Sequence, residues 1–386
     1  MTVTDATPRP AVPVAAPVAP LTPAPAGAAR GRGRRPVVAV AGLALAAALW
    51  AVAASALFVP RLTDNGDEAV YLLQAESLRA GHLFPPAAEP ARAFLPWLST
   101  TVGHHYVTKY TPVFPAFIAL GHRAFGSDRA ALALTAAGAV VACYLLAREV
   151  LGRRREAALA AGFLAGSPLF AIQSATYLSY LFNAALLMGF AAALLAGLRR
   201  EAAATPSPPL PARARPRPRE PLALAGFLLG LAVFARPFDA VLFAGPLLAW
   251  WAWSGRHRFR RLLGQAGWVA LGALPPLAAM AAYFRAATGS FLRPPFTFVG
   301  PTDTLGFGRH RMYAGMPFLD YTPGRALVAL GRLTVLTGFW GFGGLLLVGL
   351  ALVGHRSLRG RAGRWLAIVV LTVPLGYALF WGSFAS

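Results

Sequence analysis

Apolar runs of roughly twenty residues, the length that spans a bilayer as a helix, alternate with short polar segments along most of the chain. The first run covers residues 37–59, and its 23 residues are enough to cross a membrane. Hydropathy predicts eight further spans, at about 130–150, 157–175, 177–198, 221–236, 238–254, 264–284, 326–353 and 365–382. The pattern therefore predicts an all-α polytopic membrane protein with about nine transmembrane helices.

The arginines between these runs predict the orientation of the chain. They gather just before the first run and in four later segments, at 153–155, 199–219, 256–261 and 356–364. The positive-inside rule assigns all of these segments, and the N-terminus, to the cytoplasmic side. We expect residues 1–35, rich in Ala and Pro, to form a disordered cytoplasmic tail. Residues 36–386 then form the transmembrane domain.

This orientation makes a prediction about residues 111–126. The first helix leaves the membrane near Pro60, and the next arginine segment follows the span 130–150, so 111–126 must not cross. It has only 16 residues and contains two prolines, a histidine and an arginine. A re-entrant or juxtamembrane helix is therefore predicted there, and ten spans are the alternative. Two long outer segments result, 60–129 and 285–325, and connections of this length are usually functional.

Composition agrees with a membrane protein. The 386 residues are 57% hydrophobic and only 13% charged, where a soluble domain has roughly 25% charged residues, so a soluble enzyme is excluded. The net charge of +22 alone suggests nucleic acid, but most of the positive residues lie in cytoplasmic segments, so no nucleic-acid partner is expected. The single cysteine, Cys143, excludes a disulfide framework.

The first outer segment begins with several acidic residues. Residues 68–79 have helical periodicity, with an apolar stripe suited to the bilayer surface. Asp67 and Glu68 would open that helix, where its dipole favours carboxylates. The residues leave two interpretations open: a capped helix start with solvated acids, or a carboxylate held at the membrane face to remove a proton.

Lys109 is the only lysine in a chain whose other 35 basic residues are arginine. A position that keeps lysine against this bias indicates a need for a compact ammonium, and a lipid phosphate would lie at this depth; a snorkelling interfacial lysine is the alternative. His104 and His105 have no third ligand at metal spacing, so no metal site is predicted. No cofactor is required, and Asp64 with Asp67 is only a weak signal for a divalent ion.

Several short motifs occur in a characteristic order. Gly66-Asp67-Glu68 precedes Tyr71, and Lys109-Tyr110-Thr111-Pro112 precedes Pro115; further matches lie at 167–170, 173–179, 236–239 and 303–308. This arrangement resembles bacterial relatives of the dolichyl-phosphate-mannose protein mannosyltransferases and is similar to the 4-amino-arabinose lipid A transferases. The resemblance covers most of 60–325. It implies a GT-C-like bundle with juxtamembrane helices in the first outer loop.

The same resemblance implies a function. Asp67 corresponds to the catalytic aspartate, and Lys109 to a residue at the phosphate of the lipid carrier. A sugar would pass from a polyprenyl-phosphate donor to an acceptor hydroxyl on the outer face, with inversion at the anomeric carbon. The expected partners are therefore the lipid-linked sugar, an acceptor glycan, lipid or protein, and membrane lipid.

Other outer residues complete the candidate site. Glu68 lies beside the base, and Arg236, Arg309 and Arg311 are candidate phosphate ligands after Lys109. Residues expected to contact substrate are Asp64, Tyr71, His104, His105, Tyr110, Tyr177, Asp239 and Asp303. Plainer interpretations stay open: Arg236 pairs with Asp239 at a helix end, the aromatics form an interface belt, and Asp303 and Arg309 lie in a solvated loop.

Two other functions compete with sugar transfer. A lipid or solute transporter, or flippase, would place ionisable groups in mid-membrane, whereas here the spans carry almost no charge. An inactive, truncated relative is the third hypothesis, because the chain stops soon after its last predicted span. The Arg-rich composition suggests a GC-rich bacterial genome, and the expected location is the bacterial cytoplasmic membrane with the active site facing outside.

Overall fold

A computed structural model describes residues 34–91, 93–203, 219–313, 315–341, 353–354 and 361–382. Its helices are α1 (Arg34–Leu57), α2 (Gly66–Arg79), α3 (Val113–Phe125), α4 (Arg129–Leu151), α5 (Arg154–Ala165), α6 (Pro168–Ser174), α7 (Ser179–Ala203), α8 (Arg219–Ala235), α9 (Pro237–Gly255), η2 (Arg256–Arg258), α10 (Phe259–Thr288), α11 (Pro295–Val299), α12 (Pro323–Trp340) and α14 (Arg361–Tyr377). Two antiparallel hairpins complete it: β1 (Ser99–Val102) with β2 (His105–Thr108), and β3 (Gly308–His310) with β4 (Leu319–Tyr321).

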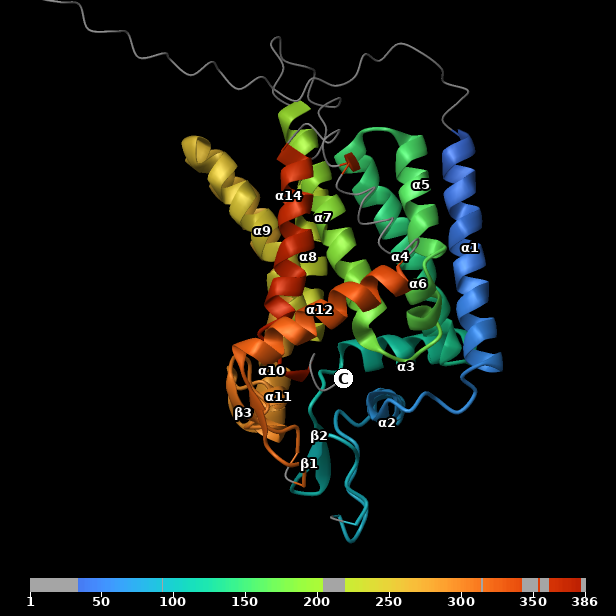
Figure 1. Cartoon of the computed structure of the whole chain (residues 1–386), viewed down its shortest axis with the longest axis vertical. Helices are drawn as coiled ribbons and strands as arrows, with labels where there is room; N and C mark the ends of the chain where they lie inside the picture. The colour runs from blue at the N-terminus through green and yellow to red at the C-terminus, as the bar shows by residue number, and fades with distance from the viewer. Residues whose placement is uncertain are drawn as a thin grey trace, which may run out of the picture.

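Long helices lie side by side along the molecule (Figure 1). Helix α4 packs against α1, α5 and α7, and α8 packs against α7 and α10. Glycines let α8 and α10 approach closely: a Cβ on Gly226 would lie 1.8 Å from the carbonyl oxygen of Val269, and one on Gly272 would lie 1.9 Å from that of Ala223. Small residues at such contacts are typical of helices that associate within a membrane.

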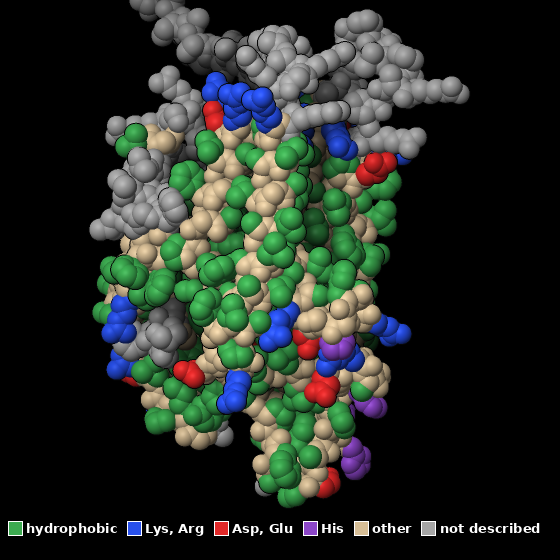
Figure 2. All heavy atoms as spheres, turned by 90° about the vertical axis from the view of Figure 1, so that its right-hand side faces the viewer, with side chains coloured by type: hydrophobic (Ala, Val, Ile, Leu, Met, Phe, Trp, Pro, Cys, Tyr) green, Lys and Arg blue, Asp and Glu red, His purple; other side chains and the backbone are tan. Residues whose placement is uncertain are grey.

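The surface of this bundle is apolar, as lipid contact requires. Large side chains such as Leu45, Leu159 and Leu274 are more than 60% exposed. Figure 2 shows hydrophobic side chains over the middle of one face, with charged groups gathered near its two ends. The interior is packed with small and aromatic residues, including Ala136 and Phe190. The molecule is therefore a helical, multi-pass membrane protein.

The number of spans predicted from the sequence is not confirmed. Four helical stretches in the described residues are long and apolar enough to cross a membrane: Arg35–Leu57, Arg129–Leu151, Ser179–Ala202 and Pro237–Thr288. The last has 52 residues and joins α9 and α10 through η2. The predicted span 157–175 is instead α5 and α6, bent by 66°, and makes a fifth if the pair is one span. Helix α8 has only 17 residues.

The two ends of the bundle differ in charge and in length of connection. The α4–α5 and α9–α10 turns and the start of α1 lie at the upper end in Figure 1, while the segments after α1 and α10 lie at the lower end. This grouping is the one that the arginine segments predicted. The tail before Arg34, most of 199–219 and the middle of 326–353 lie outside the described residues.

The lower end is built from the two long segments. Helix α3 has 13 residues, about 20 Å of helix, and lies across the ends of the spans rather than along them (Figure 1). This agrees with the prediction that 111–126 does not cross. Helix α2 forms as predicted, but Ala75 of its apolar stripe is buried, because α2 packs against α3.

Candidate active site at one end of the bundle

Asp67 lies in the first turn of α2. Asn65 caps the helix, with its side-chain oxygen accepting from the Asp67 backbone N–H at 3.0 Å. The Trp97 indole N–H donates to Asp67 Oδ1 at 3.3 Å, and the Tyr110 hydroxyl also contacts this carboxylate. Asp67 is half-buried. Local sequence thus fixes the start of α2, and two aromatic side chains from later in the chain orient the carboxylate.

Two tyrosines adjoin Asp67. The rings of Tyr71 and Tyr110 stack with centroids 4.9 Å apart, and the Tyr71 hydroxyl lies 2.8 Å from Ser179 Oγ on α7. Burial raises the pKa of Tyr71 to about 12, although the Arg236 charge acts against this shift. Burial, and then the charge of Asp67, raise the pKa of Tyr110 well above its usual range. Both phenols therefore stay protonated near neutral pH, and Tyr110 is a hydrogen-bond donor to Asp67.

Arg236 lies where α8 ends and α9 begins, and Ser179 links it to Tyr71. Its Nε donates to Asp239 Oδ2 at 2.5 Å, and its guanidinium lies 4.2 Å from the centre of the Tyr180 ring. Nη1 also reaches Ser179 Oγ at 3.4 Å. Pro237 permits this arrangement, since proline opens a helix without needing an N–H partner. The sequence allowed a simple Arg236–Asp239 pair, and the pair does form.

Among the described residues, Asp67 shares the absence of an ion pair with Asp64 and Glu68, whereas three other carboxylates at this end of the bundle are paired. Asp239, Asp303 and Asp128 each form an ion pair, with Arg236, Lys109 and Arg79 respectively. Within the part of the chain that the structure describes, Asp67 has no ion-pair partner; its side chain is held by neutral donors. A carboxylate held in this way keeps its charge uncompensated and is suited to accept a proton.

Glu68 is placed differently from the sequence prediction. It is fully buried, and its oxygens accept from the backbone N–H of Thr63 at 3.0 Å, from the Thr63 hydroxyl, and from the Tyr177 N–H at 2.7 Å. Chain donors therefore occupy the carboxylate. Through these contacts Glu68 ties the start of α2 to the segment between α6 and α7.

Lys109, predicted to lie at the carrier phosphate, is buried and paired. Its ammonium pairs with Asp303, and the two side chains are 4% and 2% exposed. The indole N–H of Trp381 donates to the other Asp303 oxygen at 2.7 Å, and the Phe296 ring centre lies 4.2 Å from the ammonium. A buried and paired ammonium does not present a free charge to a phosphate. The prediction that Asp303 lies in a solvated loop is likewise corrected, because the second outer segment folds back onto β2.

The remaining predicted residues are spread around this centre. His104 and His105 lie at the turn of the β1–β2 hairpin, away from its base near Asp67; His105 stacks on Phe84. Arg309 and Arg311 both lie over Phe318, 4.9 and 4.5 Å from its centre. Asp64 is exposed before α2, and Tyr177 is buried behind Glu68. The structure thus gathers Asp67, Tyr71, Tyr110, Arg236 and Asp239, and leaves these six outside.

Sequence reasoning missed several members of the cluster. Ser179 links Tyr71 to Arg236, and the Tyr377 hydroxyl donates to Asp239. Trp97, interpreted as an interface aromatic, contacts both Asp67 and Tyr313, whose ring centre is 5.2 Å away. Nothing in the local sequence signals these contacts, because each joins segments far apart in the chain.

The cluster offers acid–base and anion-binding groups. Among the described residues, no group of three or more His, Cys, Asp or Glu side chains is placed to hold a metal ion. What it contains is a carboxylate without a counter-charge, two protonated phenols and a guanidinium, arranged about Tyr71. Such a set is able to remove a proton on one side and stabilise negative charge on the other.

Comparison with known proteins identifies the fold. No family model matches the chain, and no curated protein has a similar sequence. Among solved structures, the chain is similar to the crystal structure of ArnT from Cupriavidus metallidurans bound to undecaprenyl phosphate, with a TM-score of 0.54 and 16% identity. The match covers 89% of this chain and 55% of that one, so the chain spans about half the length of the solved protein.

Proposed function

We propose a function that proceeds from the architecture, which is that of the GT-C membrane fold. We propose that this protein is a membrane glycosyltransferase that moves a sugar from a polyprenyl-phosphate donor to an acceptor hydroxyl on the extracytoplasmic face. The observation that carries the proposal is Asp67, a half-buried carboxylate with no counter-ion among the described residues, beside an aromatic cluster and a guanidinium. The undecaprenyl phosphate bound to the similar solved protein supports the choice of donor.

In this mechanism Asp67 takes the proton of the acceptor hydroxyl as its oxygen attacks the anomeric carbon. The bond from that carbon to the carrier phosphate breaks, and the carrier leaves as a phosphate monoester with one more negative charge. Direct displacement inverts the anomeric configuration. Tyr110 and Trp97 hold the carboxylate in place through their hydrogen bonds, and the aromatic faces nearby are suited to contact a sugar ring.

Arg236 is the cation best placed to stabilise the leaving phosphate. The Nε of Arg236 pairs with Asp239, and the side chain is 21% exposed. The terminal nitrogens of the planar guanidinium can then bind two phosphate oxygens. Asp239 and Ser179 fix its orientation, so little rotamer freedom is lost on binding. The paired Lys109 takes no direct part, and its ion pair with Asp303 instead holds the outer segments around the site.

Sugar transfer and transport are separated by whether the donor is cleaved. Purified protein reconstituted in vesicles would be given a panel of polyprenyl-phosphate sugars with acceptor glycans, lipids and peptides. We expect release of free polyprenyl phosphate and a product of inverted anomeric configuration with one donor. Movement of intact lipid-linked sugar between leaflets, without release of carrier, would favour a flippase. No turnover and no movement with any donor would favour an inactive relative.

A further inference from the structure

A second polar site lies next to α2, on a different face of this helix from Asp67. An open cavity of about 450 Å³ is bounded by the end of α1, by α2 and by the corner between α3 and α4. Asp67 and Tyr71 are four residues apart and share one face of α2, whereas Leu72, on the adjoining face, lines this cavity. The other side chains that matter here are Arg61, Leu62, His122, Arg129 and Tyr177.

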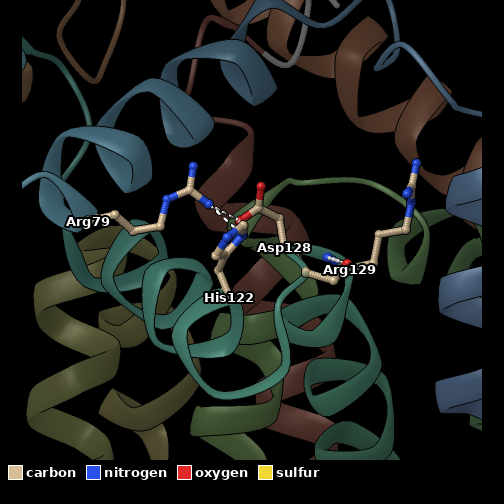
Figure 3. A network of polar contacts seen from close by, with 5 residues as sticks. Arg79, His122, Asp128 and Arg129 are labelled. Carbon is tan, nitrogen blue, oxygen red and sulfur yellow. Dashed lines mark hydrogen bonds and ion pairs between the residues drawn. The ribbon is translucent and has the colours of Figure 1, made fainter.

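The carboxylate at this cavity is already paired. Asp128 Oδ1 accepts from Arg79 Nη1 at 2.7 Å and lies 3.0 Å from His122 Nδ1, which Figure 3 shows as one compact group. The Glu68 carboxylate, next to Tyr177, accepts hydrogen bonds from the backbone N–H groups of Thr63 and Tyr177. Asp128 is therefore paired with Arg79, Glu68 accepts from neutral groups, and among the described residues neither carboxylate has an ion pair with Arg61 or Arg129.

Two further guanidinium groups line the same cavity. Arg129 follows Asp128 directly, yet Figure 3 shows its side chain extending away from that carboxylate. Its Nε is buried without a hydrogen-bond partner, and neither Arg129 nor the exposed Arg61 has an ion pair within the described ranges. An unpaired, partly desolvated guanidinium is costly, and an anionic ligand would satisfy it.

The position of the cavity indicates where that anion comes from. It lies where α1 ends, at the outer boundary of the apolar surface. Leu57 and Phe58, just before the cavity residue Val59, are each 72% exposed, and Leu62 and Leu72 line its wall. The chains of a lipid would lie on the apolar residues while its headgroup reached the arginines. We propose that this cavity binds the phosphate group of a membrane lipid headgroup, at a site separate from the Asp67 cluster.

The test uses the full chain in detergent. Its thermal unfolding would be followed while it is titrated with dioctanoyl phosphatidic acid, with dioctanoylglycerol, which lacks the phosphate, and with inorganic phosphate. The variants are Arg129→Gln and Arg61→Gln, and the control is Arg123→Gln, an exposed arginine of α3 that does not line the cavity. Two variants are used so that the test survives if one of them fails to fold.

We expect phosphatidic acid to raise the unfolding temperature of the wild type and of Arg123→Gln with the same apparent Kd. Each cavity variant should weaken that Kd by about tenfold or more, as expected for loss of a charge-assisted phosphate contact. Dioctanoylglycerol should have no such effect. Equal Kd values for all four proteins would overturn the proposal. Stabilisation by inorganic phosphate but not by phosphatidic acid would overturn the assignment to a lipid.

Discussion

Asp67 and Glu68 are neighbours in the sequence, but their carboxylates have opposite surroundings. Asp67 is half-buried and held by two neutral aromatic donors, while Glu68 is fully buried and accepts three hydrogen bonds from Thr63 and Tyr177. The sequence predicted that both open a helix, which is confirmed. It did not separate their surroundings, because one donor to Glu68, the Tyr177 N–H, comes from a loop more than a hundred residues away, and nothing local shows that Thr63 supplies the other two.

Glu68→Gln should lower stability rather than chemistry. The glutamine amide places an N–H₂ group against one of the Thr63 or Tyr177 groups that donate to Glu68. That buried donor is then left without an acceptor, which costs about 1–3 kcal/mol. We expect a clear fall in the thermal unfolding temperature of the detergent-solubilised protein. Turnover per folded molecule should change far less than in a variant of Asp67. An unchanged unfolding temperature together with lost turnover would restore Glu68 as a catalytic group.

Arg236→Lys tests the phosphate contact. Lysine keeps the charge but has one donor group in place of the planar fork, so one of two parallel phosphate contacts is lost. The KM for the lipid-linked donor should rise by about tenfold, equivalent to 1.4 kcal/mol. The same exchange at Arg309, exposed on β3, is the comparison and should leave KM unchanged. A larger effect at Arg309 would move the phosphate site to the second outer segment.

At the scale of elements, the contact between α2 and the segment before β1 positions Asp67. A Cβ on Gly66 would lie 2.9 Å from Trp97 Cδ1, so glycine at the start of α2 lets the indole pack there and donate to Asp67. The helix itself was predictable from its periodicity and its acidic first turn. The need for glycine at this position was not, since it arises from a tryptophan 31 residues further along the chain.

Gly66→Ala should displace Trp97 without unfolding α2. Overpacking of this kind costs about 1–3 kcal/mol, and here the movable group is the indole. We expect a change in tryptophan fluorescence and a loss of turnover with the helical circular dichroism unchanged. Gly42→Ala on α1, where no atom lies within 4 Å of the new methyl group, is the matched control. Wild-type turnover in Gly66→Ala would show that Trp97 does not hold the base.

Element prediction succeeded where local signals were strong and failed where tertiary contacts decide. The short, proline-containing stretch 111–126 was predicted not to cross, and α3, with 13 residues, lies across the ends of the long helices (Figure 1). The run 157–175 was predicted as one span, but the helix breaks at Gly166-Ser167 and restarts at Pro168. Hydropathy averages over such a break and does not detect it.

At the scale of the whole molecule, one buried ion pair joins the two long outer segments. Lys109 follows β2, Asp303 follows α11, and Trp381 near the end of the described chain completes the contact. The sequence singled out Lys109 as the only lysine of the chain, and the structure places it in this buried pair. The sequence suggested a phosphate as the partner of Lys109. It did not indicate Asp303, because no local sequence pattern shows that residues 285–325 fold back onto the first segment.

Removing one member of this ion pair should destabilise the protein more than removing both members together. Lys109→Ala or Asp303→Ala alone leaves a buried unpaired charge and should cost about 3–5 kcal/mol. The double variant should cost less than the sum of the two, which a double-mutant cycle on unfolding free energies measures. Strict additivity would mean that the pair does not form. A raised donor KM at unchanged stability in Lys109→Ala would return the lysine to the phosphate.

The central claim, that Asp67 is the base of an outer-face sugar transfer, is tested most directly by Asp67→Asn in reconstituted vesicles. Asparagine keeps the size and the hydrogen-bond acceptor but cannot take the proton. We predict that carrier release falls by about 10²–10⁴-fold while donor binding and the unfolding temperature stay close to wild type. Glu76→Gln, an exposed carboxylate on the same helix, should retain full turnover. Equal carrier release by the wild type and Asp67→Asn would contradict the account.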